Sequence, residues 1–376
     1  MTVRPLPLIA CLILTLMVSL GSRQAYQAIS QFGANRATAD KTQSGHPPRH
    51  KHASHLRQSA VDQAPSTELH ISLPPANNPT ALNDWQQLET ALSRQERQQA
   101  PILAAQLAES LRQQPDPDVY LRISTHVLHP NEPLANKAIL LDLLTDTATP
   151  EALNQLLDFA DLELDPSLSV LVLQSIARIG DNRWGGQFHE ELSPTLEAAW
   201  DNPMRNDVEF LAALAKAIAS IGAPKGVAQL LQTVSTTNTS QDSEATRRAK
   251  QEGAFSAIPQ IRNPAAAAAL AKGLEQEPIG SAAFDASGRG LASINSPNAT
   301  QILIDYAKDA PIESSQNLAA WVPQINDEDS LKQFAATPEN AFKNPEVGAP
   351  IQHAADKYRD NIAATNPVIQ HGAKLK

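Results

Sequence analysis

Histidine side chains are the most densely placed reactive groups in this 376-residue chain. His46, His50, His52 and His55 fall within ten residues, and imidazole is a good ligand for zinc and copper. The same stretch is basic and contains prolines, which is also typical of a solvated tether that touches anionic lipid headgroups near a membrane. Between these two alternatives we favour the tether, and we predict no metal site.

Other arrangements of reactive side chains are scarce. The sequence has no Gly-x-Ser-x-Gly elbow, no phosphate-binding glycine loop and no His-Glu-x-x-His pair. Its single cysteine, Cys11, rules out an intramolecular disulfide. The acidic run Asp327-Glu328-Asp329 begins an expected helix, where carboxylates interact favourably with the helix dipole. We therefore predict no catalytic residue, no cofactor and no enzymatic activity.

Composition narrows the class of protein. The net charge of −10 argues against a nucleic-acid binder, because the expected folded part offers no basic stripe for phosphates. Aromatic residues make up only 4% of the chain, which favours Ala/Leu helix packing over a β-sandwich. Trp85, Trp184, Trp200 and Trp321 could anchor a partner, since tryptophan is enriched in binding hot spots. For most of them we expect packing inside the fold instead.

Helix hairpins are the elements that must position any site in this chain. Six short turns recur at 147–150, 179–182, 221–224, 261–264, 294–297 and 325–328, and apolar residues lie three positions before and six positions after each. These twelve residues are Leu144, Ile176, Ile218, Ile258, Leu291, Val322, Leu156, Phe188, Leu230, Leu270, Leu303 and Phe334. Apolar residues at this spacing form one buried face of a helix, so each turn predicts two packed helices.

The distance between turns gives the length of the repeated unit. The fourth positions of the turns, residues 150, 182, 224, 264, 297 and 328, are separated by 32, 42, 40, 33 and 31 residues. We assign the excess in the two long units to insertions at 193–205 and 236–243, because repeat arrays tolerate insertions between units. The base period is therefore about 31–33 residues, as expected for a stack of helix hairpins.

Two segments carry a family resemblance. Residues 217–234, AIASIGAPKGVAQLLQTV, and residues 175–182, SIARIGDN, resemble the short HEAT-like repeat, in which an apolar helix ends in Ile-Gly-Asp/Ala-Pro before an Ala- and Leu-rich second helix. The resemblance covers about residues 134–336 and implies an all-α, right-handed α-solenoid. Such repeats occur in scaffolds, in chromophore lyases and in a metal-dependent hydroxylase, so the resemblance implies no single activity.

The resemblance draws attention to one dipeptide as a candidate pair of metal ligands. The hydroxylase with this repeat type binds iron through several His-Glu dipeptides, and this chain has one copy, His189-Glu190. A metal site needs three or four convergent ligands. We therefore expect His189 and Glu190 to be a solvated surface pair.

The N-terminus is a targeting element. The apolar run from Leu6 to Leu20 would span about 22 Å as a helix, shorter than a bilayer core, which suits a signal peptide or a short anchor over residues 1–22. Cleavage after Gly21 is one alternative and retention is the other, and we favour retention. Cys11 ends a stretch that mimics a lipoprotein box, but most of the apolar run follows it. Arg23, Arg36 and Lys41 lie after the run, which leaves the orientation open.

The remaining boundaries follow from composition. We expect a disordered Pro/His-rich linker at 23–80, a helical N-terminal cap at 81–133, HEAT-like repeats at 134–336, and a mobile tail at 337–376 with a possible helix at 351–363. The predicted function is a membrane-tethered scaffold of the bacterial cell envelope that binds another protein, single-pass in the inner membrane with the fold in the periplasm. The alternatives are a steric chaperone or assembly factor, and a soluble periplasmic or secreted protein after cleavage.

Overall fold

Helices and loops make up the whole of the described structure. The computed structural model describes residues 78–181, 183, 186–202, 204–235 and 242–365, and these residues contain no β-strand. All of them belong to one compact unit. The predicted anchor at 1–22 and almost all of the predicted linker at 23–80 lie outside the described residues.

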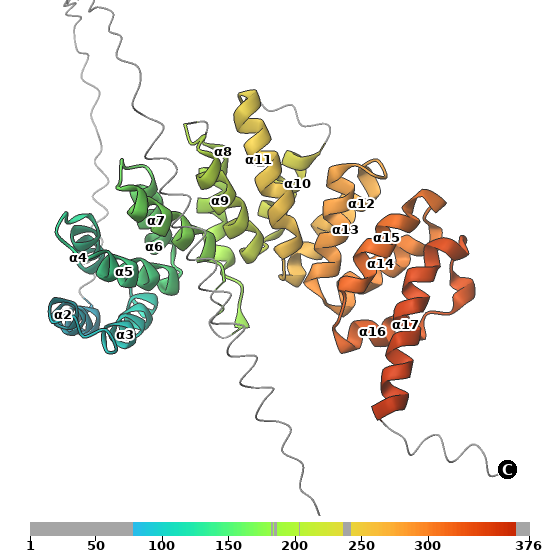
Figure 1. The fold of residues 1–376 in the computed structure, drawn as a ribbon, viewed down its shortest axis with the longest axis horizontal. Helices are drawn as coiled ribbons and strands as arrows, with labels where there is room; N and C mark the ends of the chain where they lie inside the picture. Colours follow the sequence, from blue (N-terminus) through green and yellow to red (C-terminus); the bar gives the residue numbers. More distant parts are fainter. Residues whose placement is uncertain (1–77, 182, 184–185, 203, 236–241, 366–376) are drawn as a thin grey trace, which may run out of the picture. The chain divides into compact units, whose positions relative to one another are not determined.

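The helices form two parallel rows (Figure 1). The first row contains α3 (Ala100–Gln113), α5 (Leu134–Thr147), α7 (Pro166–Arg178), α9 (Val208–Ile221), α11 (Glu244–Ala257), α13 (Ala282–Ile294), α15 (Ser315–Trp321) and α17 (Pro345–Thr365). The second row contains α2 (Pro79–Ser93), α4 (Pro117–Leu128), α6 (Pro150–Ala160), α8 (Ser193–Asp201), α10 (Pro224–Val234), α12 (Ala267–Gln276), α14 (Pro297–Asp309) and α16 (Glu328–Ala336).

Contacts between neighbours define a solenoid. Each helix of a row packs against the next helix of the same row, and hairpins such as α5 with α6, α9 with α10 and α13 with α14 pack along the chain. Short 3-10 helices extend or connect these elements: η2 (Glu190–Leu192), η3 (Ile258–Gln260), η4 (Pro264–Ala266), η5 (Ile312–Ser314), η6 (Val322–Gln324) and η7 (Glu339–Ala341). The predicted all-α solenoid is thus confirmed.

Local chemistry explains where the second helices begin. Helices α6, α10 and α14 start at a proline, whose missing N–H would have had no partner in the first turn. The first helices α5, α9 and α13 end in the left-handed conformation, at Ala148, Gly222 and Asn295. Glycine adopts that conformation without a Cβ penalty, whereas Ala148 does so at some cost in backbone strain.

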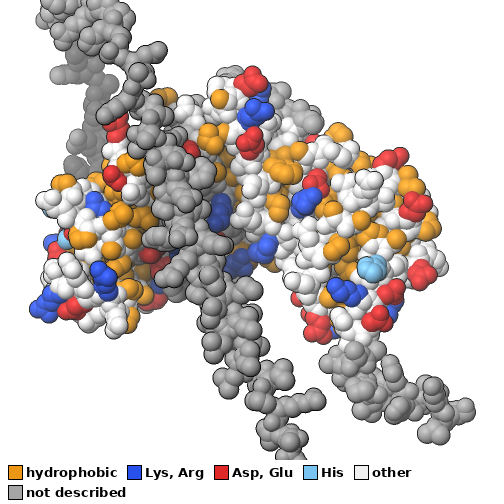
Figure 2. Space-filling model, viewed as in Figure 1, with side chains coloured by type: hydrophobic (Ala, Val, Ile, Leu, Met, Phe, Trp, Pro, Cys, Tyr) orange, Lys and Arg blue, Asp and Glu red, His pale blue; other side chains and the backbone are white. Residues whose placement is uncertain are grey.

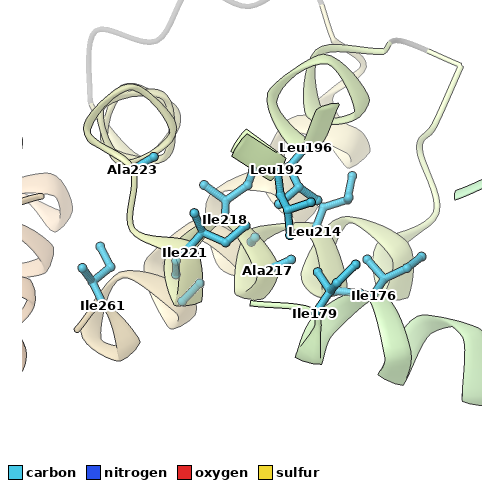
Figure 3. Packing of buried hydrophobic residues seen from close by; sticks show 14 of the residues in the cluster. Ile176, Ile179, Leu192, Leu196, Leu214, Ala217, Ile218, Ile221, Ala223 and Ile261 are labelled. Carbon is cyan, nitrogen blue, oxygen red and sulfur yellow. The ribbon is translucent and has the colours of Figure 1, made fainter. Parts of the chain in front are cut away.

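The aligned apolar positions form the core. Eleven of the twelve predicted residues are buried, and Phe188 alone is half-buried. Between the rows, Leu192 and Leu196 point toward Leu214 and Ile218 of α9 (Figure 3). Because each such contact joins a hairpin to its neighbour, the stack is held by apolar packing that runs from one unit into the next.

The unit around Phe188 differs from the prediction. We expected its second helix to start after residue 182 and an insertion at 193–205. The structure places the second helix, α8, at Ser193–Asp201, so the additional residues precede it. The reason is that Leu192 and Leu196 supply the buried face and Pro194 the helix start, whereas Phe188 lies in a segment without regular secondary structure. The other predicted insertion lies between α10 and α11, and its residues 236–241 are outside the described range.

The predicted cap at 81–133 has the period and the buried apolar positions of the repeats. Helices α3 and α4 meet at Gln114–Pro117, and Pro117 lies 33 residues before Pro150, which matches the base period. Leu111 and Ile123 occupy the two aligned apolar positions and are fully buried. The repeated architecture therefore begins earlier than the expected boundary at residue 134.

The C-terminal region is more ordered than predicted. We expected a mobile tail from residue 337 with a helix at 351–363, but α17 starts at Pro345 and runs to Thr365. Its buried Val347, Ile351 and Ala355 are spaced four residues apart and pack α17 against α16 and α15. The prediction of a mobile tail is therefore wrong for residues 345–365. None of the helices described within 78–365 is both long and apolar enough to cross a membrane.

Candidate partner-binding grooves

Three open grooves lie along the second row of helices. They separate α6 from α8, α10 from α12, and α12 from α14, with volumes of about 460, 530 and 370 Å³. Each groove lies between second helices of neighbouring units. Because the units repeat, the grooves form a series along one face of the solenoid.

The groove between α10 and α12 is the largest of the three. Small residues line it, including Ala228, Ala268 and Gly273. Gly273 also allows α12 to approach α13, because a Cβ at this position would lie 2.0 Å from the Ser287 hydroxyl oxygen. Ala228 and Ala268 are exposed on adjacent helices, and their small side chains leave space between α10 and α12.

Cationic side chains lie at the edges of the groove between α10 and α12. Lys225 and Lys272 both line it. Lys225 Nζ lies 2.6 Å from Glu197 Oε2, and the hydrogen bond with Glu197 raises the pKa of the lysine. Glu197 is itself buried and accepts a hydrogen bond from Ser193. Lys225 thus links the groove edge to α8.

The groove between α12 and α14 has a more apolar lining. It includes Leu274, Ile302 and Tyr306. The Tyr306 hydroxyl lies 2.8 Å from the Ser314 hydroxyl, and burial raises the pKa of this tyrosine. The Tyr306 ring packs against Phe284, with ring centroids 5.9 Å apart. The tyrosine therefore offers a fixed aromatic wall to a bound chain.

The groove between α6 and α8 is bounded by an ion pair. Arg205 Nε donates to Asp161 Oδ1 at 3.0 Å, and the second nitrogen, Nη2, lies 2.5 Å from Oδ2. The guanidinium also lies 5.2 Å from the centroid of the Phe210 ring. Leu157, Thr195 and other side chains line the groove beyond Arg205.

The predicted dipeptide His189-Glu190 does not converge with other ligands. His189 Nδ1 lies 3.0 Å from Glu191 Oε1, and Glu190 Oε1 accepts a hydrogen bond of 2.9 Å from Asn263. Glu190 thus contacts the turn two units further along the solenoid. Within the described residues, no group of three or more His, Cys, Asp and Glu side chains could hold a metal ion. The four linker histidines lie outside this range.

The tryptophans that the structure describes serve in packing. Trp85, Trp200 and Trp321 are buried, and Trp184 lies outside the described residues. Trp321 Nε1 donates to Asp285 Oδ1 at 2.9 Å, and its ring lies over Gly288. These three residues therefore hold α2, α8 and α15 in the stack and do not form a partner-binding surface.

Asparagines at the turns form contacts that sequence reasoning missed. Asn263 Nδ2 donates to the Ile221 carbonyl oxygen at 3.0 Å. Asn295 Oδ1 accepts from the backbone N–H groups of Asn326 and Asp327, each at 3.0 Å. The sequence signal was present, because asparagine occurs in the turns at 261–264 and 294–297.

Comparison with known proteins gives little guidance on activity. No protein-family model matches the chain, and no curated protein matches it. A solved structure that it resembles is human deoxyhypusine hydroxylase in complex with glycerol, at 16% identity and a TM-score of 0.25, covering 74% of this chain and 98% of that one. A likeness at this level carries no argument about what this chain does.

The comparison does correct one expectation. We predicted that the chain is not an enzyme, because its sequence lacks familiar catalytic motifs. The solved structure that the comparison found is that of a hydroxylase, which is an enzyme, and this finding stands against the prediction. The prediction of no enzymatic activity is therefore withdrawn.

Proposed function

We propose that this chain is a scaffold that binds another protein along the second row of helices while its N-terminal segment holds it at the membrane. The observation that supports this most directly is the series of grooves between α6 and α8, α10 and α12, and α12 and α14. A partner segment lying across the second row would meet one groove after another. Extended surfaces of this kind are how solenoids bind their partners.

The side chains of the grooves suit protein recognition. Ala228, Ala268 and Gly273 permit close approach of a partner's backbone or apolar side chains. Lys225, Lys272 and Gln232 at the edges can hydrogen-bond to the partner. An apolar floor with a polar rim is the usual composition of a protein interface. The HEAT-like nature of the repeats is part of this proposal and rests on residues 175–182 and 217–234.

The location is proposed from the N-terminal sequence. Residues 1–22 would act as the anchor and residues 23–80 as the tether, with the solenoid in the periplasm of a bacterial cell. A flexible tether of about 50 residues has a root-mean-square span on the order of 40 Å. It would keep the solenoid concentrated near the membrane while the grooves search for a partner.

Filling a groove tests the proposal. Ala228→Trp and Ala268→Trp place bulk on exposed positions of α10 and α12, whereas Ser256→Trp does so on exposed α11 of the first row. The full-length chain, tagged at its C-terminus, would be recovered from membranes of its native cells with its bound proteins. We expect the two groove variants to lose a partner that the Ser256→Trp variant retains. Equal recovery of the partner with all three variants would contradict the scaffold. Recovery of the chain only in the soluble fraction would contradict the membrane tether.

A further inference from the structure

We infer that the mouth of the groove between α6 and α8 binds a cationic amphipathic segment of the partner. We define this mouth as residues 158–165 and 204–209, which contain the loops that follow α6 and α8. The inference rests on the proposed scaffold function and specifies the chemistry of what one of its grooves binds. Three independent features of the mouth support it: exposed apolar side chains, carboxylates without partners, and a fixed geometry.

Large apolar side chains are exposed at the mouth. Leu162 is 48% exposed, Val208 is 56% exposed and Met204 is 85% exposed. Leu162 and Met204 belong to two loops that Arg205 and Asp161 join directly, and Val208 begins α9 after the second loop. A group of exposed apolar residues rimmed by polar ones marks an interaction site more often than an isolated exposed residue does.

Carboxylates flank these apolar residues. Asp158, Glu163 and Glu209 are exposed and make no hydrogen bond or ion pair with any described residue. Their neighbours Asp165 and Asp207 differ, because each accepts a hydrogen bond from a backbone N–H at the start of α7 or α9. The mouth therefore has three negative charges that no cation of the described fold balances.

The charge of the whole solenoid has the same sign. Residues 78–365 contain 37 Asp and Glu against 21 Lys and Arg, a net charge of −16. Figure 2 shows acidic and apolar side chains exposed together on the visible face. This field attracts cationic segments and repels nucleic acid, anionic lipid and a second copy of the solenoid.

Contacts within the fold hold the mouth in place. The ion pair between Arg205 and Asp161 ties the two loops together, and the Phe210 ring supports the guanidinium. The capping aspartates Asp165 and Asp207 fix the starts of α7 and α9 beside them. A preformed surface binds with a smaller loss of conformational entropy than a flexible loop does.

The two features together specify the occupant. Leu162 and Val208 require apolar side chains in the ligand, and Glu163 and Glu209 require cations beside those side chains. A bare metal ion does not fit, since no group of three ligands able to hold one occurs among the described residues. A peptide with lysine or arginine next to leucine-like residues, whose apolar side chains enter the groove along Leu157 and Ala198, satisfies both requirements.

Peptide binding to the full-length protein tests the inference. The probe is a fluorescent 14-residue helical peptide of leucine and lysine, with a leucine and glutamate peptide of the same pattern as its negative counterpart. Anisotropy titrations would compare the unmodified chain with Glu163→Lys/Glu209→Lys and with Leu162→Ser/Val208→Ser. The matched control is Glu339→Lys/Asp360→Lys, which reverses two exposed, unpaired carboxylates near the other end of the solenoid.

We expect the lysine peptide to bind, with an affinity that falls about fivefold or more in Glu163→Lys/Glu209→Lys and less than twofold in the control. The Leu162→Ser/Val208→Ser variant should weaken binding similarly, and hydrogen-exchange protection by the peptide should centre on 158–165 and 204–209. Unchanged affinity in both mouth variants, or equal binding of the glutamate peptide, would overturn the inference. Thermal unfolding of each variant confirms that the fold is retained.

One competing occupant is the chain's own basic segment at 45–57. If deleting residues 45–57 strengthens peptide binding about fivefold or more, that segment occupies the mouth and the assignment to a partner is overturned. The scaffold proposal is judged separately, by the partner lost from the α10 and α12 groove variants. If the chain keeps that partner but does not bind the lysine peptide as expected, only this inference is refuted.

Discussion

Asn263 donates a hydrogen bond of 3.0 Å from its side-chain nitrogen to the carbonyl oxygen of Ile221, which ends helix α9 at the preceding turn of the solenoid. The same nitrogen lies 2.9 Å from Glu190 Oε1, and the Asn263 side-chain oxygen accepts from the backbone N–H of Ala265. One buried side chain therefore joins three successive units. Apolar packing holds the hairpins together, and this asparagine fixes their relative register.

Replacing Asn263 by alanine should destabilise the fold by about 1–3 kcal/mol, because the Ile221 carbonyl loses its partner in a buried environment and the Ala265 N–H loses its cap. Urea unfolding measures the change. Asn340→Ala is the control, since Asn340 is exposed and has no hydrogen-bond partner among the described residues, and its effect should stay within about 0.5 kcal/mol. Equal midpoints for the two variants would show that the turn contact contributes nothing.

Replacing Gly288 by alanine should be strongly destabilising. A Cβ at Gly288 would lie 2.3 Å from Cδ2 and Cε2 of the buried Trp321 ring, so α13 and α15 would have to separate. Overpacking of this kind costs typically about 1–3 kcal/mol. The matched substitution Gly253→Ala, in α11, meets its nearest atom at 3.5 Å and should be neutral or stabilising. A destabilised Gly253→Ala with an unchanged Gly288→Ala would contradict the packing described for α13.

Stability at high pH should depend on Tyr120. Burial raises its pKa from 10.0 to about 12, with the Thr149 hydroxyl 3.1 Å from the phenol oxygen. Since the folded pKa is the higher one, the unfolded chain releases this proton first. The contribution is fully present below pH 10 and is lost as the pH rises toward 12, by about 2–3 kcal/mol in total.

Tyr120→Phe isolates that contribution. The variant loses the hydrogen bond to Thr149 at neutral pH, but it has no phenol to ionise. We therefore expect its unfolding free energy to fall less steeply between pH 9 and pH 11.5 than that of the unmodified chain. Parallel curves for the two proteins would show that Tyr120 ionises with an ordinary pKa in the folded state.

Much of the fold was predictable from the sequence because helical spacing and turn chemistry agree. Leu230 and Leu303 lie at the predicted positions, and Pro224 and Pro297 begin the expected helices. The prediction failed where spacing was assumed constant. Phe188 fits the predicted spacing, but the extra residues of that unit precede α8. The core there is formed by Leu192, Leu196 and Trp200 instead.

The ends of the solenoid and the grooves were harder to predict. The turn at Gln114–Pro117 has the right period, but it lacks the Ile-Gly sequence that made the central turns recognisable. Helix α17 contains Pro350, which reads as a helix breaker although the buried Val347 and Ile351 hold the helix in place. The grooves depend on the distances between adjacent second helices, and those distances arise from side chains of several units at once.

The measurement that tests the scaffold most directly is site-specific cross-linking from within a groove. A photoreactive phenylalanine would replace Ala228, which is exposed on α10 and lines the largest groove, or Ser256, which is exposed on α11 of the first row. Both full-length variants would be irradiated in their native cells. If the second row binds the partner, position 228 should give one discrete cross-linked product and position 256 should give no product of that size. The same product from both positions, or only from position 256, would contradict it.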